Sequence, residues 1–312
     1  MACVLDTAIG DPRWFPHPVR LMGNMIVWYE SRVRMMIHTP AGERVAGIVL
    51  AVGLPALTYA MGWLAIEMAG RADAGVKTAL TVLLAWTTLA ARDLFDHARS
   101  VVLALESGSL DGAREAVSKI VGRDTDDLSE AEVVRATVET IAESAADGVI
   151  APLFYLTVGG PPLALAYKAI NTLDSMIGHR DVHYRYFGWA SARLDDMANW
   201  APARLTAMLL ILAAACRTHT MRTAWRTFRR DGGKHPSPNS GRPEAAMAGA
   251  LGVQLGGRNV YGGVASERPL LGEAMAPLVP GQVTTALQLM GIASVMAAAL
   301  AAAALALRSW LS

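Results

Sequence analysis

Residues 274–307 read AMAPLVPGQVTTALQLMGIASVMAAALAAAALAL and contain no charged side chain over 34 positions. The hydrocarbon core of a bilayer is about 30 Å thick, and roughly 20 apolar residues cross it as a helix. This stretch is therefore long enough to span a membrane, and it places the chain among membrane proteins.

Four shorter uncharged runs lie upstream of this stretch. They cover Val45–Ile66, Thr78–Ala91, Val149–Tyr167 and Leu205–Cys216. The first and third reach span length unaided. The second reaches it if the Lys77 ammonium extends toward water, and the fourth if Met197–Arg204 supplies its first turns. A soluble protein with buried core helices is the alternative, but five such runs and a mean hydropathy of +0.31 disfavour it. We predict an all-α, multi-pass helical membrane protein with about five apolar segments.

The composition excludes several other classes. Hydrophobic residues make up 53% of the chain, and 28 Lys and Arg balance 27 Asp and Glu to a net charge of +1. This balance excludes a nucleic-acid binder that works through a broad positive excess, and the apolar content excludes a disordered chain. Cys3 and Cys216 are too few and too far apart for a disulfide framework or a zinc cluster. Asp6 and Asp11 interrupt the apolar start, so we do not expect a signal peptide there.

We predict one integral membrane domain over residues 1–312. Its parts are an N-terminal polar segment (1–44), two apolar segments (45–91), polar helices (92–148), apolar segments with a polar insert (149–216), a polar loop region (217–273) and a C-terminal apolar helix (274–312). The polar segments 1–44, 92–148 and 217–273 fall on one side and carry 20 of the 28 Lys and Arg residues. The excess of Lys and Arg in cytoplasmic loops predicts that this side faces the cytoplasm of a cell membrane.

Two local signals refine these elements. The Gly-Gly-Pro-Pro sequence at 159–162 interrupts the third apolar run, so we expect a broken segment there. The polar region 92–148 has the pattern of amphipathic helices. Within it, Ser129 and Glu132 fit a capping box that opens a helix, which we expect to end near Gly148.

The first polar segment with functional potential is DPRWFPHP at 11–18. Its three prolines exclude a helix, so the segment would hold Asp11, Arg13 and His17 in a rigid loop. The alternative is a turn at the membrane interface, anchored by Trp14.

The second segment is rich in carboxylates. It contains Asp124, Asp126 and Asp127 beside Arg123, and the helix that follows carries an acidic stripe of Glu139, Glu143 and Asp147. Clustered carboxylates suit Mg²⁺, a hard cation that prefers oxygen ligands and shares them with phosphates. The alternative is a solvated loop and a solvated helix face.

The third segment, KAINTLD at 168–174, directly follows an apolar run. On a continuing helix Lys168, Asn171 and Asp174 share one face. Ionisable groups beside a membrane segment are energetically costly and therefore indicate function.

The fourth segment is RDGGKHPSPNSG at 230–241. Its glycines allow backbone N–H groups to approach an anion, while Arg230 and Lys234 add positive charge. It lacks the spacing of a Walker A loop, and a second glycine-rich loop follows at 256–263. The alternative is ordinary turn chemistry between helices. From the residues alone, the chain is either an enzyme acting on a phosphorylated substrate or a transporter.

Long segments of the chain resemble the CobD/CbiB family, the adenosylcobinamide-phosphate synthases of cobalamin biosynthesis. The segments are GDPRWFPHPVRLMG (10–23), IVGRDTDDL (120–128), ETIAESAADGVIAPLFY (139–155), AYKAINTLDSMIGHR (166–180), FGWASARLDDMANWAPARLTA (187–207), RDGGKHPSPNSGRPEAAMAGALGVQLGG (230–257) and NVYGG (259–263). They follow the family's order and cover nearly the whole chain.

The resemblance implies a multi-pass membrane ligase. Such an enzyme joins the carboxylate of adenosylcobyric acid to (R)-1-amino-2-propanol, usually as its O-phosphate, and consumes ATP to form the amide of adenosylcobinamide phosphate. ATP and Mg²⁺ are the expected cosubstrate and metal, and no tightly bound cofactor is expected. The expected partners are the corrinoid, aminopropanol phosphate, the lipid bilayer and other late cobalamin-pathway membrane enzymes, with no nucleic acid.

The resemblance also suggests a role for each polar set. Mg²⁺–ATP would be held either by Asp124, Asp126 and Asp127 or by the stripe of Glu139, Glu143 and Asp147. Phosphates would be bound by Arg123, Arg230, Gly232, Gly233, Lys234, Asn239 and Ser240. Lys168, Asn171 and Asp174 would line the reaction centre, and His17 or His235 would be the base. Two alternatives stay open: a Mg²⁺-dependent membrane transferase of a diphosphate-activated substrate, and a transporter with its site at the 159–162 break.

Overall fold

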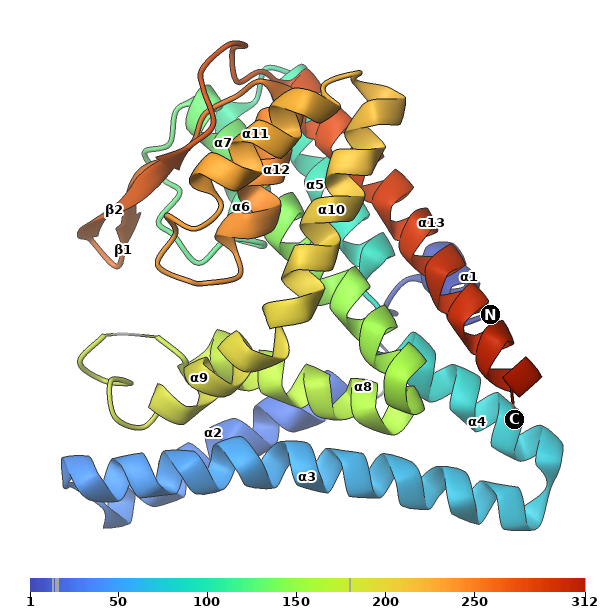
Figure 1. Cartoon of the computed structure of the whole chain (residues 1–312). Coiled ribbons are helices and arrows are strands. Elements are labelled where there is room, and N and C mark those ends of the chain that lie inside the picture. The colour runs from blue at the N-terminus through green and yellow to red at the C-terminus, as the bar shows by residue number, and fades with distance from the viewer. Residues whose placement is uncertain (13, 15–16, 180, 312) are drawn as a thin grey trace. The chain divides into compact units, whose positions relative to one another are not determined.

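The computed structural model describes residues 1–12, 14, 17–179 and 181–311. Within these residues, five helical segments are long and apolar enough to cross a membrane: Pro40–Ala72, Ala74–Glu106, Glu130–Ile177, Trp200–Arg217 and Pro280–Leu311. Helices dominate the chain (Figure 1), which confirms the predicted multi-pass helical membrane fold. Contacts divide the chain into two compact units, one formed by Met1–Ala90 with Ala151–Asn199 and the other by Ala91–Ile150 with Trp200–Ser312.

Unit 1 contains six helices among its described residues. They are α1 (Ala2–Ile9), α2 (Pro18–Met36), α3 (Pro40–Ala72), α4 (Ala74–Trp86), α8 (Ala151–Ile177) and α9 (Trp189–Ala198). Its core joins α2, α3 and α8 through buried side chains that include Ile26, Leu50 and Leu173. A Cβ added at Gly47 of α3 would lie 1.9 Å from the Phe187 carbonyl oxygen, so glycine is required for the segment after α8 to pack against α3. Small residues allow such close approach between membrane segments.

Helix α8 is kinked where the Gly-Gly-Pro-Pro sequence predicted a break. Gly159 has φ −138° and ψ 15°, and Gly160 has φ 70° and ψ −169°. The Gly160 conformation is open essentially to glycine alone. Pro161 and Pro162 follow, and because they lack N–H groups they cannot continue the hydrogen-bond ladder of the preceding turn. The predicted broken segment is confirmed.

Unit 2 contains the remaining elements. They are α5 (Ala91–Glu106), α6 (Leu110–Ser118), α7 (Glu130–Ser144), the π-helix η1 (Ala145–Ile150), α10 (Trp200–Arg217), α11 (Met221–Asp231), α12 (Gly241–Leu251), β1 (Leu255–Tyr261), β2 (Val264–Leu271) and α13 (Pro280–Leu311). Helix α10 packs against α11, α12 and α13, and α7 packs against α12 and α13. The predicted polar helices of 92–148 are thus α5, α6 and α7.

The start of α7 is as predicted, and its end is not. Ser129 and Glu132 form the capping box, with the Ser129 side chain accepting from the Glu132 N–H. The expected end near Gly148 is wrong, because the chain continues as η1 through Ile150 before α8 begins. A π-helix shifts the register of side chains, so the regular acidic stripe expected over 139–147 is interrupted at its last member.

The second glycine-rich loop, expected as irregular structure, is a β-hairpin. Strands β1 and β2 pair antiparallel with Tyr261 opposite Val264. Gly262 and Gly263 form the turn with φ 56° and 78°, the positive values that a two-residue hairpin turn requires. Gly256 marks a bulge near the start of β1, where φ is 84°.

Candidate functional site

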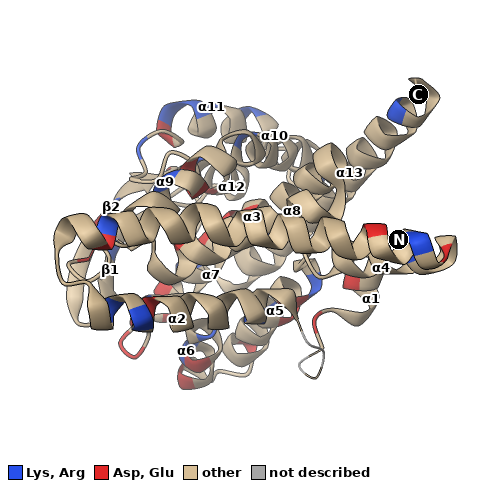
Figure 2. Cartoon of the chain, turned by 90° about the horizontal axis from the view of Figure 1, so that it is seen from below, with Lys and Arg blue, Asp and Glu red and all other residues tan. Residues whose placement is uncertain are grey.

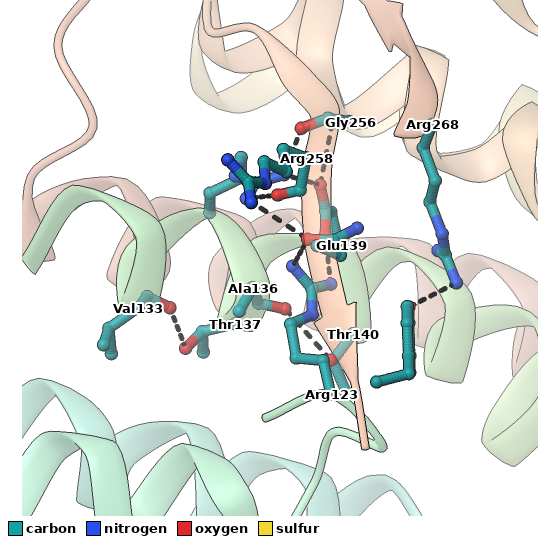
Figure 3. A network of polar contacts seen from close by, with 12 residues as sticks. Arg123, Val133, Ala136, Thr137, Glu139, Thr140, Gly256, Arg258 and Arg268 are labelled. Atoms are coloured by element: carbon teal, nitrogen blue, oxygen red, sulfur yellow. Dashed lines mark hydrogen bonds and ion pairs between the residues drawn. The ribbon is translucent and has the colours of Figure 1, made fainter. Parts of the chain in front are cut away.

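A buried ion-pair network on α7 fastens the β-hairpin to unit 2. Glu139 is 3% exposed and pairs with Arg123, while its Oε1 accepts from the Gly256 N–H at 2.8 Å. Arg135, one turn earlier, lies 3.6 Å from Glu139 and donates to the Gly256 and Arg258 carbonyl oxygens. Figure 3 shows Glu139 between Arg123 and the backbone of β1. Glu139 and Arg123, which were predicted to bind magnesium and phosphate, therefore form an ion pair with each other in this structure.

Asp124 holds the tip of the same hairpin. Its carboxylate oxygens accept from the Gly262 N–H at 3.0 Å and the Gly263 N–H at 2.7 Å, and its own N–H donates to the Val260 carbonyl at 2.8 Å. These contacts occupy both carboxylate oxygens of Asp124.

The remaining acidic candidates differ in exposure. Asp126 and Asp127 are exposed, and Asp147 is half-buried on η1. Among the residues that the structure describes, no three His, Cys, Asp or Glu side chains are grouped so that they could hold a metal ion. Mg²⁺ is usually bound through one or two carboxylates plus phosphate oxygens and water, so a smaller set suffices for it. The magnesium ligands stay a prediction.

A second buried carboxyl group lies near Glu143. The Ser240 hydroxyl donates to Glu143 Oε1 at 3.0 Å, which brings two predicted site residues together. Glu244 of α12 is 2% exposed, and its Oε1 is buried without a hydrogen-bond partner among the residues that the structure describes. Burial raises the pKa of Glu244 well above its usual value; Glu143 and Glu139 raise it further, and Arg268 opposes them. Glu244 therefore favours its protonated form.

His235 borders this carboxyl pair. Burial lowers its pKa, and the positive charge of Arg268 lowers it further while Glu143 acts in the opposite direction. Its Nδ1 accepts from the Ser237 N–H at 3.0 Å, and its Nε2 is buried with no hydrogen-bond partner in the described part of the chain. In the neutral ring the proton then resides on Nε2. His235 consequently offers a hydrogen-bond donor at Nε2.

The predicted phosphate loop is organised around Asp231. Arg230 pairs with Asp231 at 2.8 Å and also with Glu273, and Lys234 lies 2.6 Å from Asp231. The Gly272 N–H donates to Asp231 at 2.9 Å. Burial alone would raise the pKa of Asp231, but the hydrogen bonds from Arg230, Lys234 and Gly272 outweigh burial and hold it well below the usual value. Both cations of the predicted phosphate loop, Arg230 and Lys234, are therefore paired with carboxylates in this structure.

The other members of the phosphate loop differ in exposure. Gly232 and Asn239 are buried, and Gly233 is exposed. A Cβ at Gly232 would lie 2.6 Å from the Phe228 carbonyl oxygen, so the loop leaves α11 closely packed against it.

A separate cavity lies within unit 1, and charged side chains contribute to its lining. Its volume is about 440 Å³, and its lining comprises Asp11, His17, Val19, Arg20, Thr87, Leu89, Ala90 and Lys168. His17 caps α2 by accepting from the Val19 N–H at 3.3 Å, and its Nε2 lies 3.4 Å from Asp11. The cavity thus brings together two predicted site residues, His17 and Lys168. Asn171 and Asp174 lie further along α8 and are not part of this lining, and Arg13 lies outside the described residues.

Several polar residues that the sequence analysis did not single out belong to these sites. Four of them, Arg135, Asp231, Glu244 and Asn259, are buried, and Arg268 is half-buried. One signal for Glu244 is visible in the sequence, because it is the only carboxylate in the otherwise small and apolar segment EAAMAGAL at 244–251. A charged residue in such a helix is expected to be paired or functional.

Comparison with known proteins gives a consistent result over almost the whole chain. The family described as "CobD/Cbib protein" matches residues 1–290. A cobalamin biosynthesis protein CobD of Geobacter metallireducens is 50% identical over 277 residues, covering 89% of this chain and 86% of that relative.

Two further relatives extend the coverage. A cobalamin biosynthesis protein CobD of Klebsiella pneumoniae is 43% identical over 96% of this chain and 94% of its own length. A cobalamin biosynthesis protein CbiB of Salmonella arizonae is 43% identical over 100% of this chain and 97% of its own length. No solved structure matches the chain.

Proposed function

Because the chain belongs to the CobD/CbiB family of cobalamin biosynthesis proteins, we propose that it is an ATP-dependent ligase of that pathway. The reaction joins the carboxylate of adenosylcobyric acid to (R)-1-amino-2-propanol, as its O-phosphate or unphosphorylated. The product is adenosylcobinamide phosphate or adenosylcobinamide, formed through an amide bond.

The observation that carries this proposal is a cluster of polar groups in unit 2. The Ser240 hydroxyl of the phosphate loop donates to half-buried Glu143, and Glu143 acts on the pKa values of both Glu244 and His235. A buried carboxyl group with a raised pKa beside an anion-binding loop is typical of sites that move protons and bind phosphates. The relatives' names support a role in cobalamin biosynthesis over the transporter.

The chemistry requires activation of the substrate carboxylate. Direct attack by an amine would have to expel oxide, a very poor leaving group. Transfer of the terminal phosphoryl group of ATP to the carboxylate oxygen gives an acyl phosphate and ADP. The amine nitrogen then forms a bond to the acyl carbon, phosphate leaves with the C–O bonding pair, and one ammonium proton passes to a base.

We assign the residues of unit 2 to these demands. Arg230 and Lys234 exchange their pairing with Asp231 for phosphate oxygens, and the Nε2–H of His235 donates to a developing negative charge. Since Nδ1 of His235 already accepts from the backbone, the proton acceptor is better supplied by the Glu143–Glu244 pair. A carboxyl group with a raised pKa is matched to proton transfer near neutral pH.

Magnesium is assigned to the exposed carboxylates before α7. Asp126 and Asp127 are adjacent and solvent-accessible, which fits a cation that keeps several waters and shares phosphate oxygens. When bound, Mg²⁺ would neutralise phosphate charge.

The cavity of unit 1 carries charged groups that suit an amino phosphate. Arg20 and Lys168 supply positive charge for a phosphate, and Asp11 supplies a carboxylate for an ammonium group. We place the enzyme in the cell membrane with its polar segments facing the cytoplasm, on the basis of its Lys and Arg distribution.

The test uses membranes containing the full chain with Mg-ATP, adenosylcobyric acid and either aminopropanol phosphate or aminopropanol. Mass spectrometry detects the corresponding amide. We expect ATP-dependent product from one of the amines, at least about 100-fold less product from Glu244→Gln and Lys234→Ala, and an increased KM for the amine in Lys168→Ala. Asp174→Asn tests the predicted reaction-centre set of Lys168, Asn171 and Asp174.

Lys119→Ala is the matched control, because Lys119 is an exposed lysine that pairs with Glu115 one turn away. It should retain full activity. Absence of product from protein shown to be inserted and folded would overturn the proposed reaction. Full activity of Glu244→Gln would show that Glu244 takes no part in the mechanism, but it would not contradict the proposed reaction.

A further inference from the structure

We propose that helix α11 is an anionic-lipid binding surface, on which the arginine side chains of one face bind the phosphate headgroups of the bilayer. This inference does not depend on the proposed reaction. It concerns a shallow, open groove on the outer face of this helix, lined by Arg222, Trp225, Arg226, Arg229 and Arg230.

The sequence of α11, MRTAWRTFRRD, separates two faces. Ala224, Thr227 and Asp231 are buried, on the face that packs against α12. Arg222, Trp225, Arg226 and Arg229 are exposed and recur at helical spacing on the opposite face. Figure 2 shows Lys and Arg segments along α11. The helix is therefore amphipathic with a cationic outer face.

The outer arginines have no compensating negative charge in the described part of the chain. Arg230 pairs with Asp231 and Glu273, whereas Arg222, Arg226 and Arg229 form no ion pair there. No Asp or Glu occurs between residues 217 and 230. Three unpaired guanidinium groups on one exposed face complement an anionic surface.

The position of α11 selects the bilayer as that surface. The preceding helix α10 is a candidate span that ends at Arg217, and Arg217 donates to Gln288 of the neighbouring span α13 at 2.7 Å. This contact marks a polar boundary shared by both spans. Helix α11 begins four residues later, after a turn at His219, where φ is 57°. Its first turn therefore lies close to the end of the membrane span.

The shape and composition of the face also favour lipid headgroups over a nucleotide. From Arg222 to Arg229 the cationic stripe extends roughly 10 Å along the helix, which suits several headgroups in a plane better than one triphosphate. The groove is shallow and contains no glycine-rich backbone. Trp225 is 43% exposed within the stripe, and tryptophan favours the membrane–water interface.

The experiment measures lipid retained by the full chain. Wild type and the Arg222→Gln, Arg226→Gln, Arg229→Gln triple variant are reconstituted in bilayers of phosphatidylcholine with 20–30% phosphatidylglycerol, released and examined by native mass spectrometry. The fraction retaining phosphatidylglycerol should fall at least about tenfold in the triple variant, because each basic residue near an anionic surface contributes on the order of a fivefold factor. Phosphatidylcholine retention should not change.

Two further variants and one competitor make the result decisive. Changing the same arginines to lysine keeps the charge and should keep most of the bound lipid. The control Lys119→Gln, Arg193→Gln, Arg258→Gln removes equal charge from other exposed positions and should behave as wild type. Three outcomes would each overturn the proposal. The Gln triple variant could retain as much phosphatidylglycerol as wild type, the control variant could lose as much as the Gln triple variant, or millimolar ATP could displace the bound lipid.

Discussion

Glu139 illustrates how one buried charge depends on its neighbours. It is held by Arg123, Arg135 and the Gly256 N–H, so Glu139→Gln would leave two buried guanidinium groups facing a neutral amide. Removing one partner of a buried ion pair typically costs about 3–5 kcal/mol. We expect Glu139→Gln to lower the free energy of unfolding by about that amount, measured by denaturant or thermal unfolding in detergent.

Glu106→Gln is the matched control for this prediction. Glu106 is exposed at the end of α5, and surface substitutions of this kind usually change stability by less than about 0.5 kcal/mol. Equal destabilisation by the two substitutions would show that the Glu139 network contributes nothing specific.

Asp231 gives a second residue-scale prediction, one that depends on pH. Its pKa is lowered in the folded protein, against the effect of burial, by hydrogen bonds from Arg230, Lys234 and Gly272. A carboxyl group with a lowered folded-state pKa stabilises the protein above its unfolded-state pKa of about 3.9, and this contribution is lost as the pH falls toward the folded-state pKa.

Asp231→Asn should therefore destabilise the protein by about 1–3 kcal/mol at pH 6, because charged donors lose an ionised acceptor. Between pH 6 and pH 3 the difference in Tm between wild type and Asp231→Asn should narrow. A difference that widens over this interval would contradict the lowered pKa. Glu106→Gln should show little difference from wild type at either pH.

The residue-scale contacts show what sequence reasoning reached and what it did not. The predicted candidates Glu139, Glu143 and Ser240 all lie in unit 2, where Glu139 pairs with Arg123 and Glu143 accepts from Ser240. Their long-range partners were not predictable, because the Gly256 N–H reaches Glu139 across 117 positions and Ser240 reaches Glu143 across 97. Such pairs depend on tertiary packing, which the spacing of residues along one helix does not encode.

Among the elements, the kink in α8 offers the sharpest test of a backbone argument. Gly160 has φ 70°, yet a Cβ placed there would meet no heavy atom closer than 3.8 Å. Space is therefore available, and the obstacle to Gly160→Ala is backbone conformation alone. We expect this substitution to destabilise the protein by about 1–3 kcal/mol, measured as a lowered Tm in detergent.

Gly53→Ala is the control and should act in the opposite direction. Gly53 lies inside α3, and an added Cβ meets nothing within 4 Å. Alanine is favoured over glycine in a helix interior by roughly 0.5–1 kcal/mol, so Gly53→Ala should be neutral or stabilising. If Gly160→Ala also raised Tm, the positive-φ kink would not be a requirement of the fold.

The elements that were predicted well carry strong local signals. The capping box of α7 and the break in α8 depend on adjacent residues and were confirmed. The β-hairpin differs from the expected loop, although Gly262-Gly263 between β-branched and aromatic residues is a hairpin-turn signal. The π-helix at 145–150 replaces the helix end expected near Gly148, because tertiary packing and not a local sequence signal selects the wider turn.

At the scale of the whole molecule, the membrane fold was predictable because uncharged length is a direct consequence of bilayer thickness. Its orientation follows from a different quantity, the asymmetry of Lys and Arg. The polar segments on one side carry 20 of these residues and those on the other carry 8. Positive residues resist translocation, so the first side should be cytoplasmic.

Thiol labelling in a Cys3→Ala, Cys216→Ala background tests this orientation. Ser107→Cys, between α5 and α6, should react with a membrane-impermeant maleimide only after the membrane is permeabilised, whereas Ala72→Cys, at the end of α3, should react in intact cells. Both positions are exposed, so a difference in labelling reports the side of the membrane and not burial. The reverse pattern would require the proposed cytoplasmic substrates to reach the site from the opposite side. It would therefore count against the orientation and, since ATP is cytoplasmic, against the proposed ligase as well.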